Sequence, residues 1–98
     1  MIRVMIPFHL QTLAQADPEI ALDVPPPRTA LAVIRTLEAK YPTLRGAILD
    51  LATGKRRPMV RFFVCQEDIS HDSMEKPLPK DVIDGKEPFL IVGAISGG

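Results

Sequence analysis

The sequence predicts an α+β fold, in which one main helix packs on one face of a mixed β-sheet. Two segments of alternating polarity open the chain, one long helical pattern follows, and two more strand patterns come after it. Strands that gather around a single helix favour this class over an alternating α/β fold. At 98 residues, of which 46% are hydrophobic, the chain is large enough for one modest core. We therefore expect a single domain over residues 1–98.

The first quarter of the chain predicts a loose β-hairpin. Residues 2–8 place apolar side chains from Ile2 to Ile6 on one face of a strand, and residues 19–24 alternate in the same way. The polar segment between them is expected to form a loop with a short helical turn. Three prolines at positions 25–27 end the second strand, because proline cannot donate a hydrogen bond to a sheet.

The main helix is predicted over residues 30–41. Thr29 is a suitable N-cap, and Pro42 ends the helix because proline disfavours helical geometry at the residue before it. Five apolar residues form one stripe along the helix, and charged residues occupy the opposite side. The stripe consists of Ala30, Val33, Ile34, Leu37 and Tyr41.

Residues 44–54 are expected to form a second, shorter helix. Leu44, Ile48 and Leu51 recur at helical spacing, and Gly54 would end such a helix. The basic residues that follow are expected in an exposed turn, which is the usual place for a short charged cluster.

Two further strands are predicted in the second half of the chain. Residues 59–65 alternate in polarity, residues 66–88 are polar and irregular, and residues 89–95 form the most hydrophobic run. A strand as apolar as the last one is expected at the centre of its sheet. With the first and last strands as the central pair and the helix on one face, the arrangement is a β-grasp, or ubiquitin-like, fold. Its core-facing strand residues would be Ile2, Val4, Ile6, Val60, Phe62, Val64, Phe89 and Ile91.

Composition and charge argue against several classes of function. Twelve basic residues balance twelve acidic ones, so no overall field favours nucleic acid or an anionic membrane as a partner. No apolar run approaches the roughly 20 residues that span a bilayer, and the first residues lack the pattern of a signal peptide. The lone cysteine, Cys65, excludes an internal disulfide framework and is typical of a reducing compartment. We expect a soluble, cytoplasmic protein.

Few side chains are placed for catalysis or metal binding. His9 and His71 have no cysteine at ligand spacing, which favours ordinary surface histidines over a zinc site. No feature of the sequence supplies a base for Cys65, so a small hydrophobic strand residue is favoured over a nucleophile. We therefore expect no catalytic residue, no metal ligand and no bound cofactor in this chain, which would not be an enzyme.

The sequence given ends on "GAISGG", directly after the apolar strand. Chain ends are often frayed, and Gly97 and Gly98 are compatible with that simple interpretation. The other interpretation is that the terminal carboxylate is itself the reagent. Because glycines lack side chains, a flexible tail of about residues 95–98 could enter a narrow channel and leave its carbonyl carbon open to attack. The position of both glycines directly after a buried strand favours the second interpretation.

Four stretches of the chain resemble the MoaD/ThiS family of ubiquitin-like sulfur carriers. "MIRVMIPFHLQTLA" resembles the family's first strand and the loop after it, and "TALAVIRTLEAKYPTLR" resembles its helix ending in Tyr-Pro. "VRFFVCQEDIS" resembles a strand and turn of the family, and "DGKEPFLIVGAISGG" resembles its closing strand and Gly-Gly. The departures are Gly93-Ala94, where the family commonly has Pro-Pro, and additional sequence around residues 44–58.

The resemblance implies a carrier that other enzymes act on. A ubiquitin-activating-like adenylyltransferase would adenylate the Gly98 carboxylate with ATP and magnesium, and a persulfide sulfur would then convert Gly98 to a thiocarboxylate. The thiocarboxylate would donate sulfur to an acceptor enzyme such as the large subunit of molybdopterin synthase. Molybdopterin is the expected product, with thiamine or another sulfur metabolite as alternatives. A ubiquitin-like modifier that forms isopeptide bonds, and a β-grasp binding module without such chemistry, remain open.

The strand pattern also predicts where a partner docks. Side chains on the sheet face away from the helix are apolar, with Arg3 and Arg61 interspersed, and an uncovered apolar face is expected to meet a partner. The alternative is that residues 44–58 fold over part of this face. The predicted docking residues are Met5, Arg61, Phe63, Leu90, Val92 and Ile95, with Cys65 on the same face.

Overall fold

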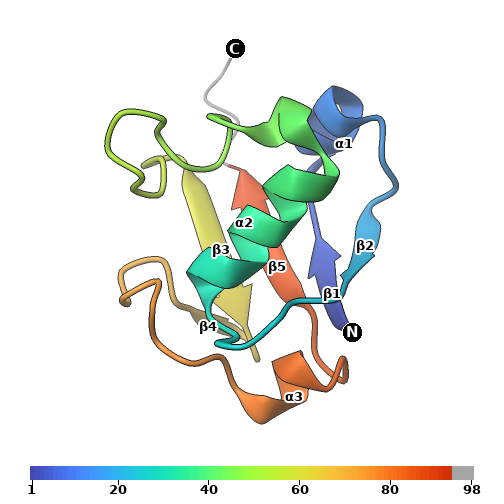
Figure 1. The fold of residues 1–98 in the computed structure, drawn as a ribbon, viewed down its shortest axis with the longest axis vertical. Helices are drawn as coiled ribbons and strands as arrows, with labels where there is room; N and C mark the ends of the chain where they lie inside the picture. Colours follow the sequence, from blue (N-terminus) through green and yellow to red (C-terminus); the bar gives the residue numbers. More distant parts are fainter. Residues whose placement is uncertain (94–98) are drawn as a thin grey trace.

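Five strands form one mixed sheet in the computed structural model, which describes residues 1–93 (Figure 1). The strand order is β2-β1-β5-β3-β4, so the first and last strands are neighbours at the centre, as predicted. These two strands run parallel, and every other neighbouring pair is antiparallel. The bounds are β1 (Ile2–Met5), β2 (Glu19–Leu22), β3 (Val60–Val64), β4 (Glu67–Asp68) and β5 (Phe89–Gly93).

Helix α2 (Ala30–Lys40) crosses one face of the sheet, as predicted (Figure 1). The Thr29 hydroxyl accepts a hydrogen bond from the Ala32 amide at 3.1 Å, which confirms the N-cap. Tyr41 leaves helical geometry before Pro42, which confirms the predicted end of the helix to within one residue.

The core lies between this helix and the sheet. All eight strand residues predicted to face the helix are buried, and so are four of the five stripe residues of α2, Tyr41 being half-buried. The rings of Phe62 and Phe89, on neighbouring strands, lie 5.3 Å apart between centroids. The alternation predicted for the strands is therefore confirmed for each of the three central strands.

The first strand is shorter than predicted because Phe8 begins a helix. Helix α1 (Phe8–Ala14) is longer than the single helical turn that the sequence led us to expect. Pro7 causes the change from strand to helix, since it has no amide hydrogen for the sheet and its fixed φ suits the start of a helix. Leu10 fills the core, and the ring of Phe8 points outward with 77% of its surface exposed.

The prediction of a second helix over residues 44–54 is wrong. The chain forms only a short 3₁₀ helix, η1 (Pro42–Leu44), and then a series of turns. Gly46 has a φ of +84°, which no right-handed helix tolerates, and the Asp50 carboxylate accepts two nearby backbone amides in place of helical hydrogen bonds. Leu51, expected on the buried side of that helix, is 69% exposed.

The segment predicted to be irregular, residues 66–88, contains two short elements. Strand β4 pairs with the end of β3, and helix α3 (Lys80–Ile83) buries Val82. The turn that leads into β4 has left-handed backbone geometry at Cys65 and Gln66, with φ of 49° and 67°. No helix within residues 1–93 is long and apolar enough to cross a membrane.

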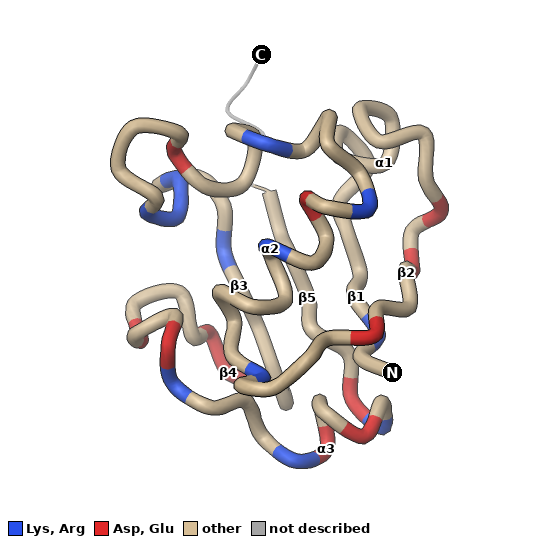
Figure 2. The backbone as a smooth tube through the Cα atoms, in the orientation of Figure 1, with Lys and Arg blue, Asp and Glu red and all other residues tan. Residues whose placement is uncertain are grey.

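Charged residues separate along the chain and in space. Lys and Arg outnumber Asp and Glu seven to two in residues 35–61, whereas acidic residues outnumber basic ones seven to three in residues 67–87. Figure 2 shows blue segments on the loop between η1 and β3, and mainly red segments around β4 and α3 at the other end of the sheet. A neutral chain therefore has a basic end and an acidic end.

Candidate functional site

The face of the sheet opposite α2 carries a row of apolar side chains across its three central strands. Met5 of β1 pairs with Leu90 of β5, and Leu90 pairs in turn with Phe63 of β3. All three side chains are half-buried, because they cover one another but no helix within residues 1–93 covers them. The sequence placed these residues together, and the register shows that they are direct neighbours.

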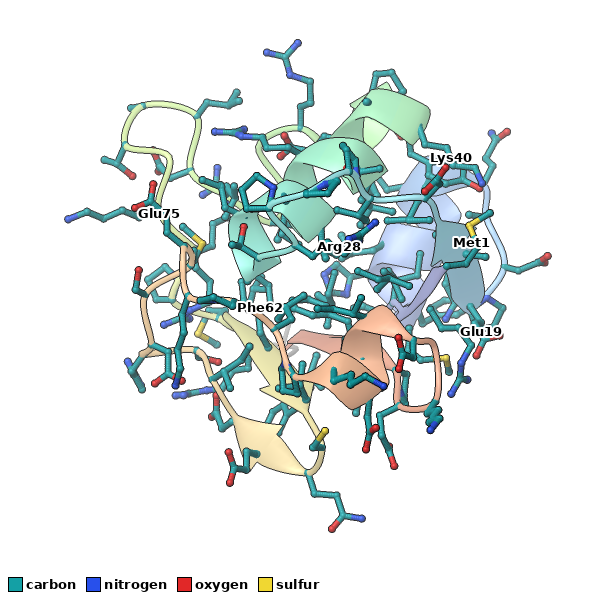
Figure 3. The ribbon with its side chains drawn as sticks, turned by 60° about the horizontal axis from the view of Figure 1, so that its bottom comes forward. Met1, Glu19, Arg28, Lys40, Phe62 and Glu75 are labelled. Carbon is teal, nitrogen blue, oxygen red and sulfur yellow. The ribbon has the colours of Figure 1, made fainter. Side chains whose placement is uncertain are left out.

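The same row continues to both edges of the sheet in acidic residues. Met5 pairs with Glu19 on β2, and Phe63 pairs with Asp68 on β4. Figure 3 shows Glu19 at the margin of the molecule, whereas Phe62, the neighbour of Phe63 on the opposite face, lies in the interior. The row is therefore apolar in the middle and charged at both ends, a distribution typical of protein interfaces.

The two arginines of this face are held at its rim. Arg3 forms an ion pair with Glu19 at 2.8 Å and also donates to the backbone oxygen of Gly85 at 2.7 Å. Arg61 forms an ion pair with Asp68 at 3.3 Å, and its guanidinium lies 3.4 Å from Nε2 of His71. The apolar centre is thereby left accessible between two anchored cations.

Asp68 is kept ionised by its surroundings. Hydrogen bonds from the Ser70 side chain and backbone amide, and the charge of Arg61, lower the pKa of the Asp68 carboxyl below its ordinary value. At neutral pH the Arg61–Asp68 pair is therefore fully charged. This orients Arg61 along the edge of the open face.

Residues 44–58 do not cover this face. Ile48 and Leu49 are buried in the core, while Val92 remains 44% exposed and Arg61 is exposed. Figure 1 shows this segment beside the end of β3 at which the strand begins. Five of the six predicted docking residues thus share one accessible face. The sixth, Ile95, lies outside the described residues, as do Gly97 and Gly98.

Gly93, the last described residue of β5, is in close contact with a side chain that the sequence did not mark as special. A Cβ atom at Gly93 would lie 2.2 Å from Cε1 of His9, so only glycine leaves room for the imidazole as placed. Gly93 also pairs with Val60 of β3, which holds its backbone in the sheet. The close approach of His9 thus explains why position 93 is a glycine. The one sequence feature that indicates this contact is Pro7, because it precedes the helix that carries His9.

The remaining reactive side chains do not assemble into a site. Among residues 1–93, no three His, Cys, Asp or Glu side chains come together in a way that would hold a metal ion. Partial desolvation, followed by the charges of Glu87, Asp81 and Glu67, raises the pKa of the Cys65 thiol. A thiol shifted in this direction is protonated at neutral pH and is a poor nucleophile.

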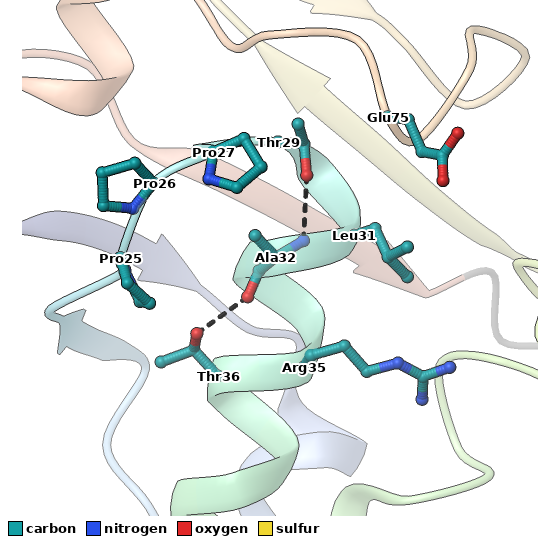
Figure 4. A pocket seen from close by; sticks show the side chains of 9 residues that line it. All are labelled: Pro25, Pro26, Pro27, Thr29, Leu31, Ala32, Arg35, Thr36 and Glu75. Atoms are coloured by element: carbon teal, nitrogen blue, oxygen red, sulfur yellow. Dashed lines mark hydrogen bonds between the residues drawn. The ribbon is translucent and has the colours of Figure 1, made fainter.

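A shallow groove lies beside the start of α2, far from the open face. It has a volume of about 490 Å³ and is lined by the three prolines and the first turns of the helix, with Arg35 and Glu75 as its charged residues (Figure 4). The two hydroxyls at the groove are already bonded, Thr29 to the Ala32 amide and Thr36 to the Ala32 carbonyl. The groove presents no group placed for chemistry.

Solved structures with the same architecture cover nearly the whole chain. The crystal structure of the Amycolatopsis orientalis BexX/CysO complex contains a chain that matches with a TM-score of 0.77 and 19% identity, over 100% of both chains. CysO from Mycobacterium tuberculosis matches with a TM-score of 0.76 and 24% identity, over 97% of this chain and 100% of that one. Small archaeal modifier protein 1 from Methanosarcina acetivorans matches with a TM-score of 0.72 and 23% identity, over 98% of this chain and 94% of that one.

The chain has the β-grasp fold. Over the described residues the sheet has a parallel central pair with one main helix across it, and the neighbours match this arrangement with TM-scores of 0.72 to 0.77. No protein-family model and no curated protein sequence matches the chain. At these identities the likeness establishes the β-grasp fold and does not by itself establish a function.

Proposed function

We propose that this β-grasp chain is a protein carrier whose reactive group is the carboxylate of Gly98. The observation that carries the proposal is the continuity of β5. One strand supplies Leu90 and Val92 to the open face and leads to Gly97 and Gly98, which are the fourth and fifth residues after Gly93. A partner docked on this face is thereby close to the end of the chain. An apolar face with a charged rim is the surface expected for such a partner.

The proposed chemistry takes place in partner enzymes. The Gly98 carboxylate attacks the α-phosphorus of ATP, which is bound with magnesium by a ubiquitin-activating-like adenylyltransferase, and pyrophosphate leaves. A persulfide sulfur then attacks the acyl carbon and displaces AMP. Reductive cleavage of the resulting acyl disulfide by a second thiol leaves a thiocarboxylate on Gly98. This chain contributes the docking surface and the carboxylate, which is a nucleophile toward ATP and becomes the electrophile once it is adenylated, and it contributes no catalytic group.

The acceptor of the sulfur is proposed to be a biosynthetic enzyme. Molybdopterin synthesis, through the large subunit of the synthase, remains our preferred pathway because of the resemblance in sequence. Thiamine and other sulfur metabolites are the alternatives. The CysO neighbour was solved in a complex with BexX, which supports a protein partner for this fold.

A modifier role is the second candidate. The neighbour from Methanosarcina acetivorans is a small archaeal modifier protein, and an adenylated Gly98 could equally acylate a lysine amine. Both candidates need the same first step and differ in the nucleophile. A binding module without activation of Gly98 is the third possibility.

Intact mass spectrometry of the protein purified from its native host separates these candidates. Exchange of oxygen for sulfur at Gly98 adds about 16 Da, and isopeptide conjugates appear as larger species. Deletion of Gly98 should abolish both products, whereas Ser96→Ala, a matched change in the same tail, should retain them. Because neither change touches the described core, both variants should unfold at the wild-type temperature. Sulfur transfer that survives deletion of Gly98 would refute the carrier proposal.

A further inference from the structure

The loop between η1 and β3, residues 46–58, is built as a fixed structure despite its lack of helix or strand. Leu49 and Arg56 pair as an isolated β-bridge, and the Asp50 carboxylate caps the turn at the tip. The Arg56 side chain donates to the backbone oxygens of Ser70 and Val60, which ties the loop to β3 and to the segment after β4. A loop held in this way presents its outer side chains in a defined arrangement.

What this loop presents is one large apolar side chain among cations. Leu51 is 69% exposed at the tip, and Lys55 is exposed on the same loop. Arg45, directly before the loop, is exposed as well. Within residues 1–93 neither Lys55 nor Arg45 forms an ion pair. The two charges and the leucine are therefore available to a partner.

The loop lies at the end of the sheet from which the chain continues to Gly98. Val60, two residues after the loop, pairs with Gly93 at the end of β5. Gly98 is the fifth residue after Gly93, and five extended residues span at most about 18 Å. A protein that binds Gly98 in its active site must therefore come within this distance of Gly93, which lies at the same end of the sheet as the loop.

We propose that Arg45, Leu51 and Lys55 form a second docking surface, which recognises an acidic patch around the entrance of the partner's channel for the chain end. The inference rests on the proposed function, because it concerns the same partner. Leu51 enters an apolar depression within the acidic patch, and the cations steer the encounter. A partner that contacts both the open face and the loop near the end of β5 is held in one direction of approach.

A membrane surface is the competing occupant of a basic loop with an exposed leucine. It is disfavoured because the basic residues of the loop belong to a chain of zero net charge, and Arg56 already donates to backbone oxygens of the protein itself. The acidic residues 67–87 would also be repelled by such a surface.

The experiment compares Lys55→Glu with Lys86→Glu, a matched charge reversal at the opposite end of β5. The readout is ATP–pyrophosphate exchange by the purified adenylating enzyme of the same organism, with the full chain as substrate. Lys55→Glu should raise the KM for the chain about fivefold to tenfold and leave kcat unchanged, because Gly98 itself is intact. Lys86→Glu should change KM less than twofold. The difference should shrink at about 1 M salt, where charges beyond about 3 Å are screened.

The outcomes separate the two proposals. If the wild-type chain supports ATP–pyrophosphate exchange and the two variants have equal KM values, the second docking surface is overturned. The proposed carrier function is then unaffected. If the wild-type chain supports no ATP–pyrophosphate exchange, the proposed function is refuted, and the second docking surface with it. Loss of binding to phosphatidylserine vesicles by Lys55→Glu, with an unchanged KM, would assign the loop to membranes and overturn the proposal. A Leu51→Ser variant should raise KM independently of salt.

Discussion

His9 and Gly93 form a contact between single residues at the point where the chain leaves the sheet. The imidazole occupies the space that a side chain at position 93 would need, with 2.2 Å between His9 Cε1 and the Cβ of an alanine. From the sequence, His9 was predicted to be an ordinary surface histidine, and Gly93 was noted only because a proline was expected near it. Their relation depends on tertiary packing of α1 against the end of β5, which no local pattern encodes.

This contact predicts that the effects of His9 and Gly93 substitutions are coupled. Gly93→Ala should be unfavourable in the wild type, because the imidazole must move, and favourable in a His9→Ala background, where alanine suits a strand better than glycine. Urea unfolding of the four proteins in the cycle should give a coupling free energy of about 1 kcal/mol. Additivity to within about 0.3 kcal/mol would show that the contact carries no energy.

The loop of residues 46–58 shows at the level of an element how a correct periodicity can mislead. Leu44 and Ile48 are both buried, as a helical stripe requires, yet the backbone between them is not helical. Gly46 and Asp50 decide the outcome, since one adopts a left-handed conformation and the other caps a turn. Glycine and aspartate are both typical of turns, so these two residues favour turns over a helix in this segment.

The Asp50 turn predicts a specific pH dependence of stability. Hydrogen bonds from the backbone amides of Thr53 and Ala52 lower the pKa of Asp50 below its ordinary value of 3.8. A carboxyl whose pKa is lowered by folding stabilises the native state above pH 3.8, and this contribution is lost as the pH falls below that value. The melting temperature of Asp50→Asn should therefore be lower than that of wild type at pH 7, and the difference should shrink below pH 3.8.

Differential scanning calorimetry between pH 7 and pH 2 measures this difference. Asparagine keeps the shape of the side chain and one oxygen acceptor, so the loop itself should persist in the variant. A difference in melting temperature that stays constant over the whole range would show that the charge of Asp50 contributes nothing to the turn.

At the scale of the whole molecule, the two faces of the sheet differ in how far their side chains are buried. The face under α2 is filled with buried side chains, and the opposite face leaves Met5, Leu90 and Phe63 half-covered between two arginine ion pairs. A sheet with one packed and one accessible face can bind a partner without giving up its own core. The docking role of the open face stays a prediction.

The open face predicts a large effect of Phe63→Glu on partner binding. Phe63 lies in the row with Leu90 and Met5, and a carboxylate there would have to lose its water in the complex. Affinity for the adenylating enzyme, measured by calorimetry, should fall at least about tenfold. The matched control is Phe8→Glu, which introduces the same charge at a ring that is 77% exposed on α1. Equal affinities for both variants would mean that the open face is not the docking surface.

The sequence by itself determined the fold class, the central pair of strands, the bounds of α2 to within one residue and the eight core-facing strand residues. These features follow from periodicity and from proline and capping signals, which act between residues close together in the chain. It also placed five of the six predicted docking residues on one face, because alternation along a strand separates the two faces of any sheet.

Tertiary structure alone decided which of these residues touch. The register that sets Leu90 between Met5 and Phe63, the imidazole of His9 against Gly93, and the anchoring of residues 46–58 through Arg56 all join segments distant in sequence. Such contacts depend on how whole elements pack, since side-chain shape is matched only when the core is assembled. For this protein, local patterns determined the surfaces that exist, and packing determined how they are arranged around the end of β5.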